Sequence, residues 1–501
     1  MRTALALPAI LLPSALLTAG CFGTSPSSGG GQVRPADAER RINPADVALP
    51  AGYRIEAVAT RLTFPTAVAF DDQNRPYVVE AGYSYGEFFA KPRLVRIEPG
   101  GGRTEIAAGA VNGPWTGVAF HGGNFYVAEG GVMRGGAILR VSPDGKITPL
   151  IQDLPSKGDH HTNGPAVSPD GSSIYFSIGV ATNSGVVGTD NAHFGWLKRD
   201  PSFHDIPAKD IKLTGENFTT ENPLSNDKNA KAVTGAYLPF NTPSQPGQVI
   251  PGKIPCTGGI FKMPLAGGEA QLVAWGLRNP FGLAFAPDGR LFCTENSYDV
   301  RGSRPVYGSG DVLWPITPGT WYGWPDFHAG YPLTWSDHYQ APGKPAPKFL
   351  LAEHPNAPPT PAAVLPVHGS YCGFDFSRSS RFGFAGQAFI AAFGDMAPGV
   401  GKVMAPVGFR VDRVDPNTGV IEVFAANRGK DNGPASRIHG GGLERPVAAR
   451  FDNTGEVLYV VDFGVMTMDG DKPQPRQETG VLWRIIRTAT VAGAEQQEVV
   501  R

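Results

Sequence analysis

The chain has 501 residues, with 44 Lys and Arg against 45 Asp and Glu, so its formal net charge is −1. This balance, without a basic or acidic block, argues against nucleic-acid binding. Apolar residues make up 41% of the chain, enough for a sizeable core, and 65 Gly and 47 Pro without a period indicate many turns and exclude collagen.

The first 21 residues have the pattern of an export signal. Arg2 precedes an apolar stretch over 4–17 that is too short, and too interrupted by proline, for a membrane span. The following Leu-Thr-Ala-Gly-Cys run ends at Cys21 and resembles the bacterial lipoprotein signal, in which this cysteine becomes the lipidated first residue. We therefore expect an exported protein, anchored by lipid at Cys21 and facing the periplasm or cell surface, in the outer membrane of a Gram-negative cell. The alternative is an ordinary secretory signal with an incidental cysteine.

The rest of the chain divides into three parts. Residues 22–45 are rich in Ser, Gly and Pro and predict a flexible tether, followed by one domain over 46–490 and a polar tail over 491–501. Beyond the signal the chain has three cysteines, Cys256, Cys293 and Cys372. Because three is an odd number, at least one thiol is free or pairs between chains.

One unit recurs along the domain: an apolar strand, a polar turn and a second apolar strand, which in most copies ends in an acidic residue. Asp-Gly and Asn-x-Gly turns between short β-branched and aromatic runs are hairpin signals. Six copies cover 65–80, 114–129, 165–177, 280–295, 372–391 and 446–462. Candidate outer strands lie at 93–97, 137–141, 259–263 and 481–485. This repetition predicts an all-β fold, a six-bladed β-propeller. A pair of β-sandwiches is the alternative.

The later copies are further apart than the first three, because long loops are inserted at 184–255 and 299–367. These loops are rich in Pro, Asn, Gly and Trp. Long insertions on one face of a repeat fold usually mark its functional face. We therefore expect the functional site on the side that carries these loops.

Two stretches of the repeat are distinctive. The first reads Gly-Asp-His-His-Thr-Asn-Gly at 158–164 and leads into a Ser-Pro-Asp-Gly turn at 168–171. The second reads Gly-Leu-Arg-Asn-Pro-Phe-Gly-Leu-Ala-Phe at 276–285, followed by Thr-Glu-Asn at 294–296 and Tyr-Gly-Trp-Pro at 322–325. Together they resemble the glucose/sorbosone dehydrogenase family over roughly residues 50–487. The resemblance implies a six-bladed propeller that holds pyrroloquinoline quinone (PQQ) with Ca²⁺ and oxidises an alcohol or a sugar carbon, passing electrons to an external acceptor.

Oxidation of an alcohol carbon requires a base, a hydride acceptor and a positive group for the developing charge. His160 precedes the Pro-Asp turn at the spacing of the family's catalytic histidine, and imidazole titrates near neutrality. His161 is the alternative base. Asp159 is expected to orient His160 or to raise its basicity. Arg278 matches the family's Arg-Asn pair, which faces the quinone, and its guanidinium suits a developing oxyanion.

The resemblance also implies binding residues. Those expected to hold the cofactor are Asn279, Arg278, Arg445 and Lys402. The family holds Ca²⁺ largely with backbone carbonyls after a Thr-Glu-x motif, which implies Asn296, Ser297 and Tyr298 as metal ligands. This chain departs from the family at these three residues, since the family's soluble glucose enzymes have Gly-Pro there.

The sequence therefore favours a PQQ-dependent dehydrogenase that acts on a sugar or polyol. Its expected partners are the substrate, an external electron acceptor and a membrane reached only through the lipid anchor, with no nucleic acid. One alternative is a Ca²⁺-dependent propeller lactonase with a metal on the axis. Glu80, Glu129 and Glu295 end equivalent strands and could form an acidic ring. With Asn163 and Asn296 they are the candidate ligands of such a metal. The other alternative is a non-catalytic propeller that binds carbohydrate or protein.

Overall fold

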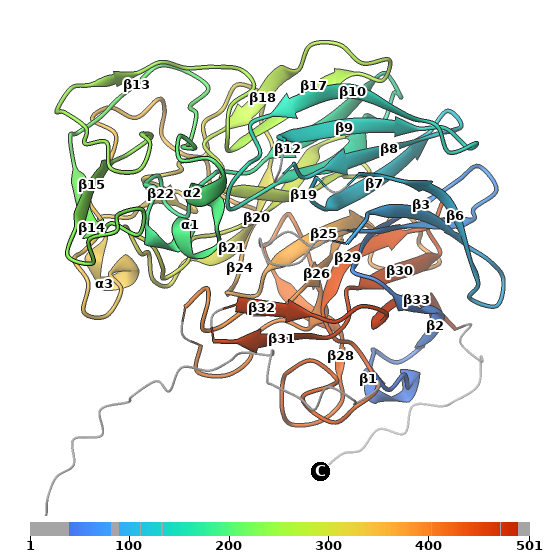
Figure 1. Ribbon diagram of the computed structural model, residues 1–501. Coiled ribbons are helices and arrows are strands. Elements are labelled where there is room, and N and C mark those ends of the chain that lie inside the picture. The colour runs from blue at the N-terminus through green and yellow to red at the C-terminus, as the bar shows by residue number, and fades with distance from the viewer. Residues whose placement is uncertain are drawn as a thin grey trace, which may run out of the picture.

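The computed structural model describes residues 40–81, 90–110, 112–131, 134–401, 403–470 and 472–488. They form six antiparallel sheets around a central axis, a β-propeller (Figure 1). The predicted fold is confirmed, and each repeat copy supplies the first two strands of one blade. The predicted lipidation site Cys21, most of the tether, Lys402 and the tail lie outside the described residues.

In each blade the four main strands lie side by side, in order from the axis outward. They follow chain order in every blade except the last, where β2 (Tyr53–Leu62), from the start of the domain, is the outermost strand. The first three blades are β3 (Pro65–Phe70), β4 (Pro76–Glu80), β5 (Arg93–Ile97) and β6 (Arg103–Ala108); β7 (Trp115–His121), β8 (Asn124–Glu129), β9 (Gly136–Val141) and β10 (Ile147–Leu154); and β11 (Thr162–Val167), β12 (Ser173–Ile178), β17 (Gly259–Pro264) and β18 (Gln271–Trp275). The last three blades are β19 (Asn279–Phe285), β20 (Leu291–Asn296), β21 (Gly310–Pro315) and β24 (Ala363–Val367); β25 (Tyr371–Phe376), β26 (Ala388–Ala392), β27 (Arg410–Val414) and β28 (Ile421–Asn427); and β29 (Pro446–Phe451), β30 (Val457–Asp462), β33 (Gly480–Arg487) and β2 (Tyr53–Leu62).

The ring of blades is closed by the N-terminal part of the domain. The inner strands contact one another in the cyclic order β3, β7, β11, β19, β25, β29 and back to β3. β2 crosses to the last blade and pairs with β33 as its outermost strand. The 3-10 turn η1 (Pro44–Asp46) leads into β1 (Val47–Ala48), which pairs with β28 of blade five. Both ends of the domain are thereby fixed to its last two blades, and two outer sheet edges are covered.

The second strands of the blades are buried on both faces, which explains their continuous apolar runs.

Every inner strand contains the same irregularity, a β-bulge, near its start. In the inner strands a bulge brings neighbouring blades together: a Cβ on Gly117 would lie 1.7 Å from the Gly164 carbonyl oxygen, so only glycine is tolerated. The bulges fall between Pro65/Ala67, Trp115/Gly117, Asn163/Ala166, Pro280/Gly282, Tyr371/Phe374 and Pro446/Ala448.

The acidic residues that end second strands hold their own blades together. Glu295 accepts hydrogen bonds from the backbone N–H of Arg278 and, at 2.5 Å, from the indole of Trp314. Asp462 similarly accepts from the Trp483 indole at 3.2 Å. Each carboxylate thus satisfies buried donors from the strands beside it. This is the physical reason for the recurring acidic residue.

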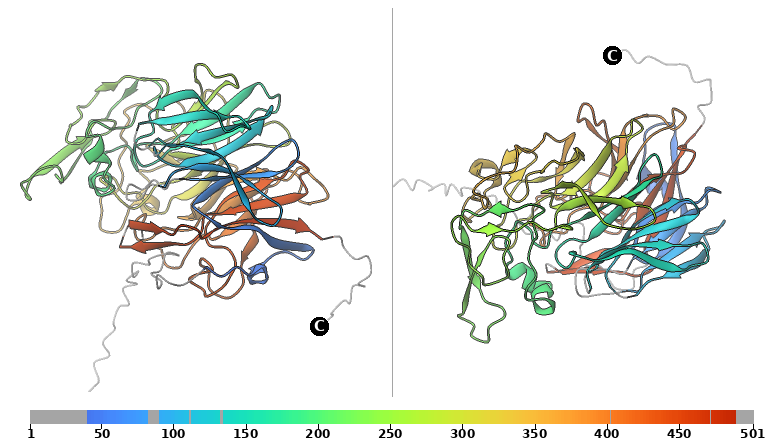
Figure 2. Two further views of the ribbon diagram at one scale, coloured as in Figure 1. Left: turned by 45° about the vertical axis from the view of Figure 1, so that its right-hand side comes forward. Right: turned by 90° about the horizontal axis from the view of Figure 1, so that it is seen from above.

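Two insertions form a lobe on one side of the propeller (Figures 1 and 2). They meet at a bridge between Leu213 and Leu351, and Asp326 accepts from the backbone N–H groups of Leu350 and Leu351 while pairing with the buried Arg304 at 3.1 Å. Blade three inserts α1 (Thr189–His193), α2 (Trp196–Arg199), β13 (Ile211–Lys212), β14 (Asn217–Glu221), β15 (Lys231–Gly235) and β16 (Val249–Ile250). Blade four inserts β22 (Phe327–His328), β23 (Tyr331–Pro332) and α3 (Ser336–Tyr339).

Smaller features complete the fold. A hairpin of β31 (Met466–Asp469) and β32 (Lys472–Pro475) projects from blade six. Cys256, Cys293 and Cys372 are all free and buried. No helix within the described ranges is long and apolar enough to cross a membrane.

Candidate functional site

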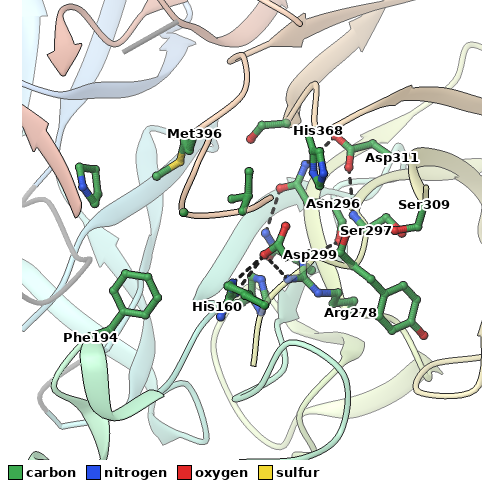
Figure 3. A pocket seen from close by; sticks show the side chains of 17 residues that line it. His160, Phe194, Arg278, Asn296, Ser297, Asp299, Ser309, Asp311, His368 and Met396 are labelled. Carbon is green, nitrogen blue, oxygen red and sulfur yellow. Dashed lines mark hydrogen bonds and ion pairs between the residues drawn. The ribbon is translucent and has the colours of Figure 1, made fainter. Parts of the chain in front are cut away.

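Two adjoining cavities lie where the inner strands begin. The axial cavity is lined by inner-strand residues of all six blades: Thr66, Thr116, Asn163, Asn279, Phe281, Cys372 and Val447. The polar cavity is lined mainly by residues of the segment 296–311, with further contributions from Phe194 of the blade-three insertion and from residues between 368 and 400. Both cavities share His160, Asn279, Asn296, Ser370 and Met396. Figure 3 shows His160, Arg278, Asn296 and Asp299 grouped in the polar cavity, with Phe194 and Met396 across from them.

His160 is held by the backbone around it. Residues 159–161 pair with 179–181, and the His160 N–H donates to the Val180 carbonyl at 3.2 Å. The same carbonyl lies 3.0 Å from Nδ1 of the imidazole. Because a carbonyl only accepts, Nδ1 carries the hydrogen and Nε2 of the neutral ring keeps a lone pair. A Cβ on Gly179 would lie 2.3 Å from the His160 Cβ, so this position requires glycine.

The imidazole of His160 is kept neutral by its surroundings. Burial lowers its pKa well below the usual value, and the charges of Arg278 and Arg301 lower it further. Burial also lowers the pKa of His161, to about 4. His161 lines only the axial cavity, whereas His160 lines both cavities. Of the two candidate bases, His160 is therefore the one placed between the cavities.

Two arginines and three aspartates form a buried cluster beside His160. Arg301 pairs with Asp159, with Asp190 at 2.8 Å and with Asp299 at 3.0 Å. Asp159 Oδ2 also lies 3.7 Å from Nε2 of His160. The principal partner of Asp159 is thus Arg301, and the Val180 carbonyl orients the imidazole.

Arg278 is almost completely engaged by the protein. Its side chain donates to the Asn183 carbonyl at 3.0 Å, to the Asn183 side-chain oxygen at 2.8 Å, to the Asn296 carbonyl at 3.2 Å and to Asp299 Oδ2 at 2.8 Å. A guanidinium has five N–H hydrogens, so one on Nη1 remains for a ligand. Arg278 is 2% exposed and lines the polar cavity.

Two of the three backbone carbonyls expected to bind calcium already accept hydrogen bonds from the protein. The Asn296 carbonyl accepts from Arg278, and the Tyr298 carbonyl accepts from the Ser309 hydroxyl at 3.0 Å. The Ser297 N–H donates to Asp311 at 2.9 Å. Within the described residues no group of three or more His, Cys, Asp or Glu side chains is placed to hold a metal. This donor set does not fit Ca²⁺, although all three residues line the polar cavity.

Two further residues were expected to hold the cofactor, Arg445 and Asn279, and both are hydrogen-bonded within the protein. Arg445 is fully buried, lines neither cavity, and donates to the Gly394 and Asp395 carbonyls at 3.1 Å. Asn279 lies in the wall between the cavities, where its side chain bridges Asn163 at 3.2 Å and Asn296 at 2.9 Å.

The strand-end glutamates do not form a ring around the axis. Glu80 pairs with Arg93 and Arg103, and Glu129 accepts from the Trp115 indole at 3.1 Å. Neither these two residues nor Glu295 lines either cavity. The axial metal that a propeller lactonase requires is therefore not built from them.

Two buried oxygen atoms at the axial cavity have no hydrogen-bond partner among the described residues. They are Asp159 Oδ1 and Asn163 Oδ1. With Nε2 of His160 they make three acceptors, which a ligand with several hydroxyl donors satisfies. Much of the remaining lining is apolar and includes Phe281, Phe393, Val447, Phe463 and Met466.

Sequence reasoning missed Asn183, Asp190 and Arg301 as site residues. Asn183 and Asp190 belong to the insertion of blade three, and Arg301 to the long loop between β20 and β21. No repeat copy covers these segments, so the sequence carried no signal for where they fold. The general expectation that the long loops border the site was the one available pointer.

Comparison with known proteins establishes the fold. No protein-family model matches the chain, and no curated protein matches it. The holo pyranose dehydrogenase PQQ domain of Coprinopsis cinerea is 15% identical over 90% of this chain and 99% of that one, with a TM-score of 0.52. A calcium structure of the Trichoderma reesei Carbohydrate-Active Enzymes Family AA12 protein is 16% identical over 90% and 100%, with a TM-score of 0.52. A glucose dehydrogenase structure is 14% identical over 86% and 98%, with a TM-score of 0.50.

The chain shares the propeller fold of PQQ-dependent sugar dehydrogenases. The resemblance seen in the sequence is thereby confirmed at the level of the fold. At these identities the likeness carries no residue roles, so function rests on the geometry of the site.

Proposed function

We propose that the chain is an oxidoreductase that oxidises a hydroxyl-bearing carbon of a sugar or polyol, with PQQ as the hydride acceptor. The observation that carries this proposal is the placement of His160 between two cavities with Nε2 unprotonated. The fold and the three acceptors of the axial cavity support it.

His160 is the general base. Its neutral imidazole accepts the proton of the substrate hydroxyl at Nε2, while Nδ1–H remains on the Val180 carbonyl. The nearby carboxylate of Asp159, 3.7 Å from Nε2, favours the imidazolium that forms. Arg278 and Arg301 oppose it and so favour release of the proton afterwards.

The axial cavity binds the substrate. Asp159 Oδ1 and Asn163 Oδ1 accept hydrogen bonds from hydroxyl groups next to the reacting carbon. The rings of Phe281 and Phe393 pack against the C–H face of the sugar and exclude water.

The polar cavity offers hydrogen-bond donors to the quinone. Its donors are the remaining Nη1 hydrogen of Arg278, the Arg301 guanidinium and His368. PQQ, when bound, supplies an ortho-quinone that takes up the hydride. We also propose that the protein is exported and anchored at Cys21, since this would place electron transfer outside the cytoplasm.

The test uses the purified full chain and two readouts. PQQ binding is followed by fluorescence quenching, and turnover by dye reduction with a panel of aldoses and polyols. His160→Gln is expected to lower turnover roughly 100-fold or more while PQQ affinity stays within about twofold.

His161→Gln is the matched control, since His161 neighbours the base but lines one cavity alone. Equal loss in both variants would remove the base role from His160. Absence of sugar-dependent dye reduction in the PQQ-saturated protein would overturn the proposed function. Lactone hydrolysis that a chelator abolishes would favour the lactonase instead.

A further inference from the structure

Four oxygen atoms converge on the guanidinium of Arg278. They are two from Asn183, one carbonyl and one amide, the Asn296 carbonyl and a carboxylate oxygen of Asp299, at 2.8 to 3.2 Å. These are the donor types that a hard divalent cation takes: carbonyl, amide and carboxylate oxygen. In this chain the position at their centre is filled by a positively charged side chain.

Arg278 is fixed in this position from its backbone outward. Its N–H donates to Glu295, and its carbonyl accepts from the Val180 N–H at 2.9 Å. The side chain is 2% exposed, and the residue immediately precedes the inner strand β19. Its backbone and side-chain contacts together therefore fix the guanidinium at the wall of the polar cavity.

Oxygen atoms of Asp311 and Tyr298, near the 296–299 loop, also accept hydrogen bonds. Asp311 accepts from the N–H of Ser297 at 2.9 Å with one oxygen and from the N–H of Tyr371 at 2.7 Å with the other. The Tyr298 carbonyl accepts from the Ser309 hydroxyl. Calcium takes six to eight oxygen ligands, and this loop does not offer them.

We infer that the guanidinium of Arg278 is the resident cation of this site, and that the protein binds its cofactor without Ca²⁺. This inference deepens the proposed function and rests on it for the identity of the cofactor. The claim about the metal rests on the oxygen contacts of Arg278. The inference predicts that the cofactor site of this propeller is complete without a divalent cation.

Two measurements on the purified full chain test the claim. Elemental analysis is expected to find far less than one Ca²⁺ per chain, and the melting temperature is expected to be the same in EDTA and in excess CaCl₂. PQQ affinity, measured by fluorescence quenching, is expected to agree within about twofold between these two conditions. Stoichiometric Ca²⁺, stabilisation by Ca²⁺, or PQQ binding that requires Ca²⁺ would each overturn the inference.

The variant Arg278→Met removes the cation and releases its four oxygen partners. We expect it to gain Ca²⁺-dependent thermal stabilisation and sensitised Tb³⁺ luminescence, neither of which the parent shows. Arg304→Met is the matched control, because Arg304 is equally buried but pairs with Asp326 in the insertion lobe. Metal binding gained by both variants would show general loosening and count against the inference.

If Arg278→Met does not fold, Arg278→Lys keeps the charge and is expected to remain free of metal. Calcium uptake by the lysine variant would contradict the role given to the charge. Failure of PQQ to bind under every condition would overturn the proposed function. The metal content and the thermal response to Ca²⁺ would still decide the inference about Arg278.

Discussion

Replacement of Glu295 by glutamine tests how the burial of one carboxyl group makes the free energy of unfolding depend on pH. Glu295 is the penultimate residue of β20, is 8% exposed, and accepts hydrogen bonds from the Arg278 N–H and the Trp314 indole. Burial raises its pKa from 4.5 to about 7. The folded state thus holds a proton on this carboxyl that the unfolded chain has already released.

The sign and size of the effect follow from linkage. A carboxyl whose pKa is raised on folding contributes stability below pH 4.5, and this contribution is lost as pH rises toward 7. A shift from 4.5 to about 7 corresponds to a loss of about 3 kcal/mol at pH 7, at about 1.4 kcal/mol per pKa unit. Glu295→Gln cannot ionise and is expected to lack this loss.

The assay is urea unfolding of both proteins at a series of pH values from 4 to 8. Other buried groups change stability with pH as well, but they are shared and cancel in the difference between the two proteins. That difference is expected to move in favour of the variant by about 3 kcal/mol between pH 4.5 and 7. The lost hydrogen bond to one of the two donors adds a constant offset.

An exposed glutamate provides the control. The Glu353 side chain is 76% exposed, so Glu353→Gln is expected to leave the pH dependence unchanged. Parallel curves for the parent and Glu295→Gln would refute the reasoning. That result would mean that the two donors to Glu295 offset its desolvation in full.

Three further variants test the site and its support. Gly179→Ala is expected to displace His160 and lower turnover at least tenfold, because its Cβ would lie 2.3 Å from the His160 Cβ. Arg301→Met removes a cation that holds the pKa of His160 low, so the acidic limb of kcat/KM, expected well below pH 6.5 in the parent, is expected to move to higher pH. Asp326→Ala leaves the buried Arg304 unpaired and is expected to cost about 3–5 kcal/mol in urea unfolding.

Each of these variants has its own control. Gly102→Ala meets only ordinary van der Waals contact and is expected to keep full turnover. Arg301→Lys keeps the charge and is expected to keep the acidic limb where it is. Asp288→Ala breaks an exposed pair, worth roughly 0–1 kcal/mol. A tenfold loss in Gly102→Ala, an unmoved limb in Arg301→Met or equal costs for the two aspartates would contradict the respective argument.

The blades were predictable because each is encoded locally. The copy at 65–80 predicts a strand at 65–70 and another at 76–80, and the structure has β3 and β4 at those residues. A hairpin closes over a few residues, so the pattern of apolar residues and its turn determine the structure. β2 was not predicted, because its partner β33 lies at the other end of the chain and neither strand contains a copy of the repeat.

The candidate site likewise has one part that the sequence predicts locally and one part that it does not. The surroundings of His160 come from two short segments of one blade, 159–161 and 179–181, so the motif at 158–164 was enough to single out a histidine that lines both cavities. The cation site instead depends on Asn183, which an insertion outside the repeat brings to Arg278.

A short sequence motif can therefore predict a structural feature that is built by one hairpin. It cannot predict a feature whose contacting residues come from separate segments of the chain. The Thr-Glu-Asn run of β20 resembles the glucose/sorbosone dehydrogenase motif, yet the Asn296 carbonyl at its end accepts a hydrogen bond from Arg278. Whether that oxygen faces a guanidinium or a metal is determined by the insertion and by Asp299, which no pattern in the repeat describes. A propeller of this fold can thus keep the base and exchange the cation beside it, since the two depend on different parts of the chain.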